Sequence, residues 1–331
     1  MNILLTTRCN KNCSFCFARQ AAAAKIEDMS LENFQKLILL AKAENYAGVK
    51  LLGGEPTIHP DFSAMLTFLS KERFPATLIS NLLYTDPAVR ECINQAAAKG
   101  IIHGVLANAA ELNTPETLGI FKQNYSALLE ATAKEPGKIT AGITLSRQKS
   151  AAEETEYIAF LAQNIYISRL RLSLDFQAEN VEDKFFINNK EYGQKILAVV
   201  HKCLDLRIPI SWDCKLYPCM FEEAVFQKDI AGFAQSLRLD CQAGGAPFDV
   251  FPDMSYIHCY PARVLSGQNI LKFSRISEAL NEIAFRKKAL QALQKNNPPG
   301  ECKECNYYRT GRCDSLCLGC RELTASFLTQ E

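Results

Sequence analysis

Residues 3–16 are Ile3-Leu4-Leu5-Thr6-Thr7-Arg8-Cys9-Asn10-Lys11-Asn12-Cys13-Ser14-Phe15-Cys16. The first five are apolar or β-branched, as in a buried strand, and three cysteines then follow with the spacing C-x3-C-x2-C. Thiols spaced in this way can hold three corners of a cubane iron–sulfur cluster and leave the fourth iron without a protein ligand. The stretch therefore predicts a strand followed by a loop that binds such a cluster.

A second stretch, Gly53-Gly54-Glu55-Pro56, directly follows the strand-like residues 48–52. Two residues without side chains let a ligand lie against the backbone, and a proline stiffens the turn. Glu55 offers a carboxylate to an ammonium group. The cysteine spacing alone would also fit a zinc knuckle or an electron-transfer centre, but the second stretch weakens both alternatives.

Together the two stretches resemble the radical S-adenosylmethionine (radical SAM) enzymes, and the resemblance covers most of the chain. It implies that a [4Fe-4S] cluster is ligated by Cys9, Cys13 and Cys16, and that S-adenosyl-L-methionine (SAM) chelates the open iron. It further implies that the amino group of SAM is held by Gly53, Gly54, Glu55 and Pro56, with Phe15 beside the adenine. In this family, one electron cleaves SAM to a 5′-deoxyadenosyl radical, which removes a hydrogen atom from the substrate.

Composition indicates a globular protein that binds metal. The chain has 331 residues, 48% of them hydrophobic, and a formal charge of +1, which gives no attraction to nucleic acid. We expect neither a signal peptide nor a membrane span, since the start lacks a basic segment and no run reaches about 18 apolar residues. In the cytoplasm that this predicts, 14 cysteines indicate metal binding.

Short apolar runs alternate with longer runs of helical spacing through roughly the first 210 residues. The expected strands cover residues 2–7, 48–52, 76–80, 101–107, 138–145 and 168–174. The expected helices cover residues 30–44, 60–71, 86–99, 115–134, 151–163 and 190–206. This alternation predicts an α/β fold with a parallel sheet, and the pattern alone leaves a doubly wound sheet as a competitor. The resemblance implies a partial (β/α)6 TIM-type barrel, whose site lies at the carboxyl ends of the strands.

Polar residues at the later strand ends are further candidates for SAM binding. By resemblance, the ribose or carboxylate of SAM would be contacted by Asn81, Asn108, Thr144 and Arg171. The alternative is that asparagine, serine and threonine there simply form turns after strands. We identify no catalytic acid or base, and Asp175, Asp213 and Tyr217 are better explained as structural.

We expect a core barrel at residues 1–210 and a small cysteine-rich domain at residues 211–331, with a hairpin over 248–259 and a helix over 276–294. The second domain resembles the SPASM extension of certain radical SAM enzymes, which binds one or two auxiliary [4Fe-4S] clusters. The implied ligands are Cys214, Cys219, Cys241, Cys259, Cys302, Cys305, Cys313, Cys317 and Cys320. Met254 replaces the usual glycine, and the gap between Cys305 and Cys313 is longer than usual, which leaves the allocation of ligands open.

Two other interpretations of these cysteines remain. Cys302-x2-Cys305 and Cys317-x2-Cys320 are paired as in a zinc ribbon. The spacing from Cys313 to Cys320 also repeats that of the N-terminal motif, and only the strand before Cys9 and the Gly-Gly-Glu-Pro loop favour the first copy as the SAM site. Cys92 and Cys203 fall in expected helices, where cysteine is usually a small buried hydrophobe.

The resemblance favours an oxidoreductase that modifies a peptide or protein side chain by oxidation, cross-linking, thioether formation or epimerisation. It also implies an external low-potential electron donor of the flavodoxin or ferredoxin type. The first strand begins at residue 2, so we expect no preceding peptide-binding domain, which favours a separate recognition protein or a small-molecule substrate. The alternatives are thus a small-molecule radical SAM enzyme and a non-catalytic iron–sulfur or zinc protein.

Overall fold

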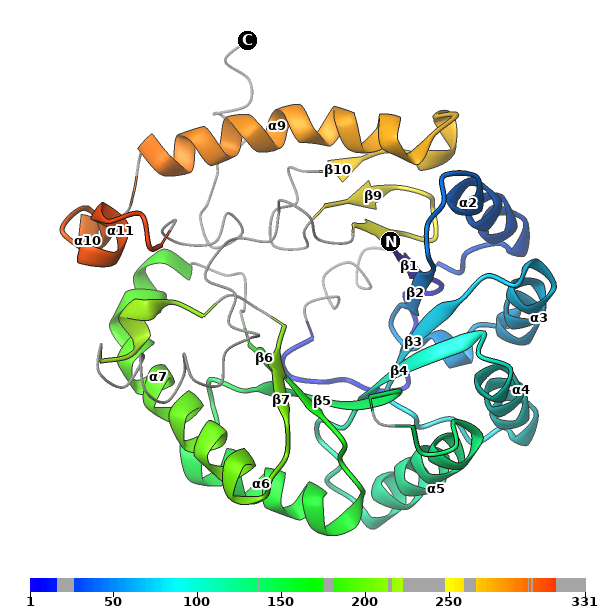
Figure 1. Ribbon diagram of the computed structural model, residues 1–331, viewed down its shortest axis with the longest axis horizontal. Helices are drawn as coiled ribbons and strands as arrows, with labels where there is room; N and C mark the ends of the chain where they lie inside the picture. Colours follow the sequence, from blue (N-terminus) through cyan, green and yellow to red (C-terminus); the bar gives the residue numbers. More distant parts are fainter. Residues whose placement is uncertain are drawn as a thin grey trace.

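The computed structural model describes residues 1–16, 27–135, 137–175, 181–213, 216–222, 248–258, 266–296, 298 and 300–313. In this part of the chain a ten-stranded sheet has the order β10-β9-β8-β1-β2-β3-β4-β5-β6-β7. Helices form an outer arc around the curved run from β1 to β7, which identifies a partial β/α barrel and not a doubly wound sheet (Figure 1).

Seven neighbouring strands of the barrel are all paired in parallel. They are β1 (Asn2–Leu4), β2 (Val49–Leu52), β3 (Ala76–Ser80), β4 (Ile102–Asn108), β5 (Ile139–Leu145), β6 (Leu170–Leu174) and β7 (Ile210–Trp212). The crossover helices are α2 (Leu31–Ala43), α3 (Phe62–Glu72), α4 (Pro87–Ala98), α5 (Pro115–Ala131), α6 (Ala151–Asn164) and α7 (Val181–Asp205). The six predicted strands and six predicted helices are confirmed, with ends shifted by up to about three residues, except that α7 begins nine residues earlier than predicted.

Local chemistry explains where these helices begin. Ser30 caps α2 by accepting from the Asn33 N–H at 3.2 Å, and Asp86 caps α4 in the same way. Thr114 and Ser150 start α5 and α6 with reciprocal capping boxes. Each cap satisfies a backbone N–H that would otherwise lack a partner, so the sequence fixes these boundaries locally.

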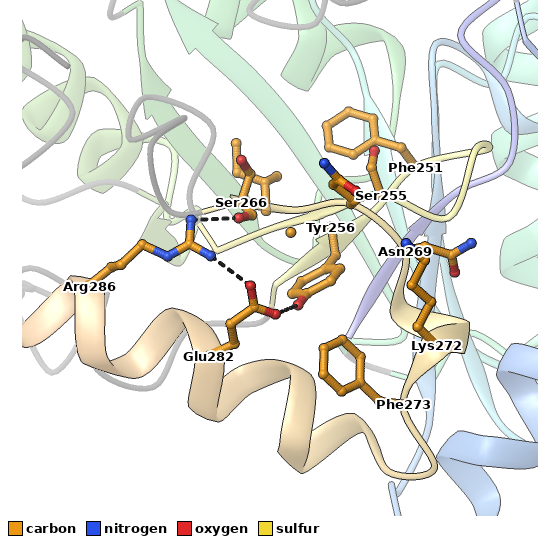
Figure 2. A pocket seen from close by; sticks show the side chains of 12 residues that line it. Phe251, Ser255, Tyr256, Ser266, Asn269, Lys272, Phe273, Glu282 and Arg286 are labelled. Carbon is orange, nitrogen blue, oxygen red and sulfur yellow. Dashed lines mark hydrogen bonds and ion pairs between the residues drawn. The ribbon is translucent and has the colours of Figure 1, made fainter. Parts of the chain in front are cut away.

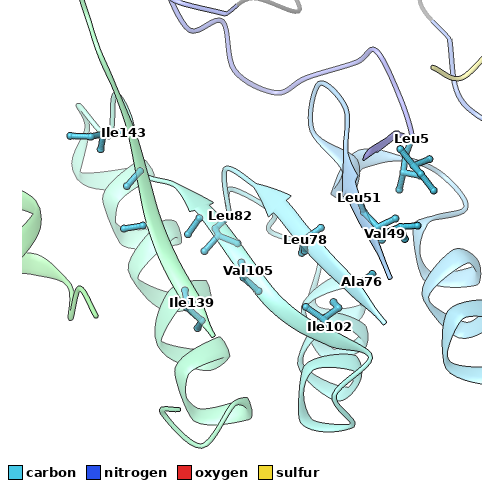
Figure 3. Close-up of a cluster of buried hydrophobic side chains, with 14 of the residues drawn as sticks. Leu5, Val49, Leu51, Ala76, Leu78, Leu82, Ile102, Val105, Ile139 and Ile143 are labelled. Atoms are coloured by element: carbon cyan, nitrogen blue, oxygen red, sulfur yellow. The ribbon is translucent and has the colours of Figure 1, made fainter. Parts of the chain in front are cut away.

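The core lies between the strands and the helices. In β3, burial alternates along the strand, so that Ala76, Leu78 and Ser80 are buried while the residues between them are half-buried. Figure 3 shows the buried face continuing across the sheet from Leu51 through Leu78 and Val105 to Ile139. This packing holds the carboxyl ends of the strands, and hence the loops that follow them, at one edge of the sheet.

The C-terminal part adds three short strands to the other edge of β1. Strand β8 (Asp249–Val250) runs parallel to β1, whereas β9 (Tyr256–Ile257) and β10 (Ser266–Gly267) continue antiparallel. Beyond them lie η6 (Ile270–Lys272), α9 (Ile276–Asn296), α10 (Gly300–Lys303) and α11 (Asn306–Arg309). The predicted hairpin and α9 are confirmed. Because the sheet is continuous, the boundary predicted at residue 210 stays a prediction.

Met254 at the hairpin turn has a φ of +68°. This left-handed conformation favours glycine, which is the residue that the SPASM pattern usually has there. The Met254 side chain is nevertheless buried, so its apolar contacts offset the strain of the turn.

In the described part of the chain, no helix is both long enough and apolar enough to cross a bilayer.

Candidate functional site

The three N-terminal cysteines lie in the loop that follows β1, called here the cluster loop (residues 8–16). Cys9 and Cys16 are exposed and Cys13 is half-buried. The loop begins at a fixed point, because Arg8 Nε and Nη2 donate to the two carboxylate oxygens of Asp28 at 3.1 and 2.8 Å. The predicted cysteine loop therefore occupies the carboxyl edge of the first barrel strand.

Two glycines after β2 bring the second motif against the cluster loop. Gly54 N–H donates to Thr6 O and Glu55 N–H to Arg8 O, both at 2.8 Å. A Cβ on Gly53 would lie 2.4 Å from Thr6 O, and one on Gly54 would lie 2.0 Å from Arg8 O. The sequence analysis explained these glycines by the approach of a ligand, whereas the structure shows the chain's own cluster loop in that space.

Glu55 is buried, and its carboxylate is used within the protein. One oxygen accepts from Thr57 N, Thr57 Oγ1 and Ser80 Oγ at 2.7 to 3.2 Å, and the other accepts from Asn81 N at 2.8 Å. Burial raises the pKa of this carboxyl, and the four donors oppose that shift. Glu55 thus ties the turn after β2 to the end of β3. A contact of Glu55 with the amino group of SAM stays a prediction.

Asn81 links the end of β3 to the cluster loop. Its Nδ2 donates to Asn10 Oδ1 at 2.7 Å, and its Oδ1 accepts from Leu83 N at 2.8 Å. Asn108, at the end of β4, accepts from Ala110 N at 3.2 Å. Both amides therefore also form the local turns that the alternative interpretation predicted.

Phe15 and Thr144 line one small cavity between the cluster loop and the ends of β4 and β5. The other lining residues include Glu111, Ser146, Lys149, Glu154 and Tyr157. Two residues predicted to contact SAM from distant parts of the sequence are thus brought together. On β6, Ser173 is the residue that pairs with Thr144. Arg171 lies two residues before Ser173 and forms an ion pair with Asp213.

Two buried charged residues that bond to Ser146, in the lining of this cavity, were not predicted from the sequence. Glu154 accepts from Ser146 N at 2.8 Å, and Lys195 donates to Ser146 O at 2.7 Å, from α6 and α7 respectively. Burial raises the pKa of Glu154 and lowers that of Lys195, and their opposite charges counter both shifts. The available signal was a charged residue on the apolar face of each helix.

The Cys219 thiol lies within electrostatic reach of three other C-terminal thiols. Burial raises the pKa of Cys219 to about 12, and Cys313, Cys305 and Cys302 add to the shift by repulsion of its thiolate form. Cys219 is carried by η2 (Pro218–Met220), directly after the barrel. Cys214, Cys241, Cys259, Cys317 and Cys320 lie outside the described residues, so their predicted roles, including the zinc-ribbon pairing, stay predictions.

A single metal ion and a cubane cluster require different arrangements of thiols. Among the described residues, no three His, Cys, Asp or Glu side chains are arranged to hold a single ion. A cubane cluster instead places each thiolate on a different iron, so its ligands need only surround a larger object. The thiols of Cys9 and Cys16 lie close enough to Cys13 to help raise the pKa of its thiol, on a half-exposed loop that such a cluster can reach. The residues therefore fit a cluster better than a single ion.

A separate cavity of about 760 Å³ lies between β9, β10 and α9. Figure 2 shows Tyr256, Phe273 and Lys272 around it, with Arg286 donating to Ser266 O and Glu282. Cluster-loop residues are absent from its described lining.

The fold and the cluster loop define a parallel β/α barrel with a candidate cofactor site at its carboxyl edge. In a comparison with family models, residues 3–134 match the radical SAM superfamily. This part of the chain is therefore similar to a radical SAM domain.

Similar curated proteins match over short segments. A tungsten-containing aldehyde ferredoxin oxidoreductase cofactor-modifying protein of Pyrococcus furiosus is 34% identical over 92 residues, which are 26% of this chain and 25% of that protein. An S-adenosylmethionine-dependent nucleotide dehydratase of Selenomonas ruminantium is 28% identical over 82 residues, 24% of this chain and 29% of that protein. The matches thus span about a quarter of each relative.

Solved structures share the fold over most of the chain. Streptococcus suis SuiB bound to precursor peptide SuiA has a TM-score of 0.58 at 15% identity, covering 84% of this chain and 63% of SuiB. The protein anSMEcpe with bound AdoMet has a TM-score of 0.59 at 15% identity, covering 93% of this chain and 86% of its own. At this identity the likeness concerns the fold alone.

Proposed function

We propose that this protein is a radical SAM enzyme that takes a hydrogen atom from a peptide or protein side chain. The observation that carries the proposal is the backbone pairing of the cluster loop with the Gly53–Pro56 turn, through Gly54 N–H and Glu55 N–H. This pairing places the cysteine loop beside the turn predicted to hold SAM. The chemistry that the cluster and SAM supply when bound is one-electron cleavage to a 5′-deoxyadenosyl radical.

The protein's own residues prepare the site for that chemistry. Cys9, Cys13 and Cys16 would ligate the cluster, while Asn81 and Glu55 hold the surrounding loops by hydrogen bonds. Phe15 and Thr144, which line the same small cavity, would contact the adenosyl part of SAM. A low-potential donor of the flavodoxin or ferredoxin type would supply the electron, in the cytoplasm.

The activity test is anaerobic reconstitution followed by measurement of 5′-deoxyadenosine. We expect SAM cleavage by the wild-type protein and loss of at least about tenfold in Cys13→Ala, with Cys92→Ala, a cysteine of α4 remote from the motif, as the matched control. Equal cleavage by wild type and Cys13→Ala would contradict the proposal.

We further propose an auxiliary metal site formed by Cys219, Cys302, Cys305 and Cys313. The electrostatic influence of Cys302, Cys305 and Cys313 on the Cys219 thiol supports it, although Cys219 is more than 80 residues away from them in sequence. Four thiolates would saturate a cluster and favour electron transfer. Total iron should then approach roughly eight per chain, because each cubane holds four, and Cys219→Ser should lose about four. Bound zinc in their place would contradict this assignment.

The substrate class rests on the fold shared with SuiB, a structure that was solved with a precursor peptide. A small-molecule substrate is the second candidate, because the curated relatives are named for a cofactor-modifying protein and a nucleotide dehydratase. A deuterated candidate peptide, chosen from genes adjacent to this one, separates the two. Deuterium appearing in 5′-deoxyadenosine supports the peptide, and transfer only from a labelled metabolite supports the alternative.

A further inference from the structure

Both spacer segments between the N-terminal cysteines are held by one turn after β4. Between Cys9 and Cys13, Lys11 Nζ donates to Ala110 O at 2.5 Å and to Glu111 O at 3.4 Å. Between Cys13 and Cys16, Ser14 Oγ donates to Glu111 Oε1 at 2.9 Å. Glu111 therefore contacts each spacer, once through its backbone and once through its carboxylate.

The turn that carries Glu111 is itself fixed to the barrel. Tyr157, on α6, donates from its hydroxyl to Ala109 O at 2.5 Å and accepts from Leu112 N at 3.0 Å. Glu111 has a left-handed φ of +55° and lies between Ala109 and Leu112, the two residues that bond to Tyr157. These two hydrogen bonds tie the turn that supports the cluster loop to α6.

Lys11 and Glu111 also bring opposite charges to the thiols. Lys11 lies between Cys9 and Cys13 in the sequence, and the Glu111 carboxylate accepts from Ser14, the residue after Cys13. In addition, Lys11 N–H donates to Cys9 Sγ at 3.4 Å. A positive charge and an N–H···S bond stabilise a reduced cluster, and a nearby carboxylate disfavours it.

We propose that Lys11 and Glu111 are positioning residues that hold the cluster loop and shift the reduction potential of its [4Fe-4S] cluster in opposite directions. The inference rests on the proposed function, because that cluster is the one assigned to Cys9, Cys13 and Cys16. Lys11 raises the potential and Glu111 lowers it. Glu111 additionally restrains Ser14, so that its two roles can be separated by substitution.

The test is a redox titration of the anaerobically reconstituted full chain, followed by electron paramagnetic resonance. The N-terminal cluster is recognised as the signal that changes when SAM is added. We expect Lys11→Gln to lower its midpoint potential and Glu111→Gln to raise it. Exposed residues of the same charge on α2 provide matched controls, so Lys36→Gln and Glu32→Gln should leave the potential unchanged.

Iron retention separates the restraint from the charge. Glu111→Gln keeps an oxygen that can accept from Ser14, so we expect this variant to lose iron to a chelator at the same rate as the wild-type protein. Glu111→Ala removes that acceptor, and we expect several-fold faster loss from the N-terminal cluster. If Lys11 and Glu111 had only a general structural role, Lys11→Gln and Glu111→Gln would not shift the midpoint potential in opposite directions.

Two results would overturn the inference. One is a wild-type midpoint potential in both neutral variants, and the other is a shift in the same direction in both. If either occurred while wild-type protein still cleaved SAM, the proposed function would stand and this inference alone would fail. A wild-type protein with no SAM-responsive cluster would remove both.

Discussion

At the scale of single residues, His59 shows how a polar side chain near a turn can be wholly structural. It is 4% exposed, its Nδ1 accepts from Asp61 N at 3.0 Å, and its Nε2–H donates to Met29 O at 2.9 Å. These bonds need the neutral ring, and burial lowers its pKa. The contact with Met29 O could not be predicted from the sequence, because nothing local reveals a backbone carbonyl 30 residues away.

The lowered pKa of His59 predicts a pH dependence of stability. The unfolded chain takes up a proton near its ordinary pKa of about 6.5, whereas the folded protein does so only at lower pH. Unfolding free energy should therefore fall as the pH drops below about 6.5, by at most about 1.4 kcal/mol per pH unit for this group. Urea unfolding at several pH values should show a shallower dependence in His59→Asn. Asp249, whose pKa burial raises to about 6, titrates in both proteins and cancels in the comparison. Equal slopes would refute the assignment.

Glu55 gives a second prediction at this scale. In Glu55→Gln, an amide group would face the Asn81 N–H or the Thr57 and Ser80 donors, leaving buried donors unpaired. We expect a loss of about 1–3 kcal/mol in unfolding free energy, against a change within about 0.5 kcal/mol for the exposed Glu32→Gln. If SAM affinity fell while stability did not, the carboxylate would be bonding the ligand and not the loops.

At the scale of elements, α7 positions the segment that carries Cys219. A Cβ on Gly193 would lie 2.0 Å from Met220 O, in η2, so the helix and η2 pack backbone to backbone. Gly119, in α5, has nothing within 4 Å of its Cβ position and serves as a matched control.

Gly193→Ala should therefore displace η2, lower stability and reduce the iron bound at the proposed auxiliary site. Gly119→Ala should raise helix stability by up to about 1 kcal/mol and leave iron unchanged. Urea unfolding and iron content measure both variants. Full iron in Gly193→Ala would show that η2 has no part in the metal site.

Elements with a long periodic pattern were predictable, and short or irregular ones were not. The apolar runs and caps gave α2 to α6 within about three residues, because burial and N-capping act locally. Strand β7 was missed, since three residues cannot show a period. The predicted first strand continues to residue 7, but its ladder ends at Leu4, because Thr6 instead bridges to Asp28. Helix α7 begins at Val181, nine residues before the predicted start at residue 190.

At the scale of the whole molecule, the two motifs were predictable but the contacts between them were not. The sequence places the cysteines and Gly53–Pro56 after successive strands, and parallel pairing of β1 with β2 brings them to one edge. The bonds from Glu111, Lys195 and Tyr157 join loops far apart in sequence and leave no local pattern. Likewise, the pairing of β8 with β1 makes the C-terminal part continuous with the barrel sheet. The predicted division into a barrel and a cysteine-rich domain did not include this pairing.

The most direct test of the central claim is electron paramagnetic resonance of the reduced, reconstituted protein before and after SAM, with 5′-deoxyadenosine quantified in the same samples. We predict that SAM changes the spectrum of one cluster, that 5′-deoxyadenosine forms, and that Cys13→Ala loses both. An unchanged spectrum with no 5′-deoxyadenosine from iron-replete wild-type protein would contradict the account.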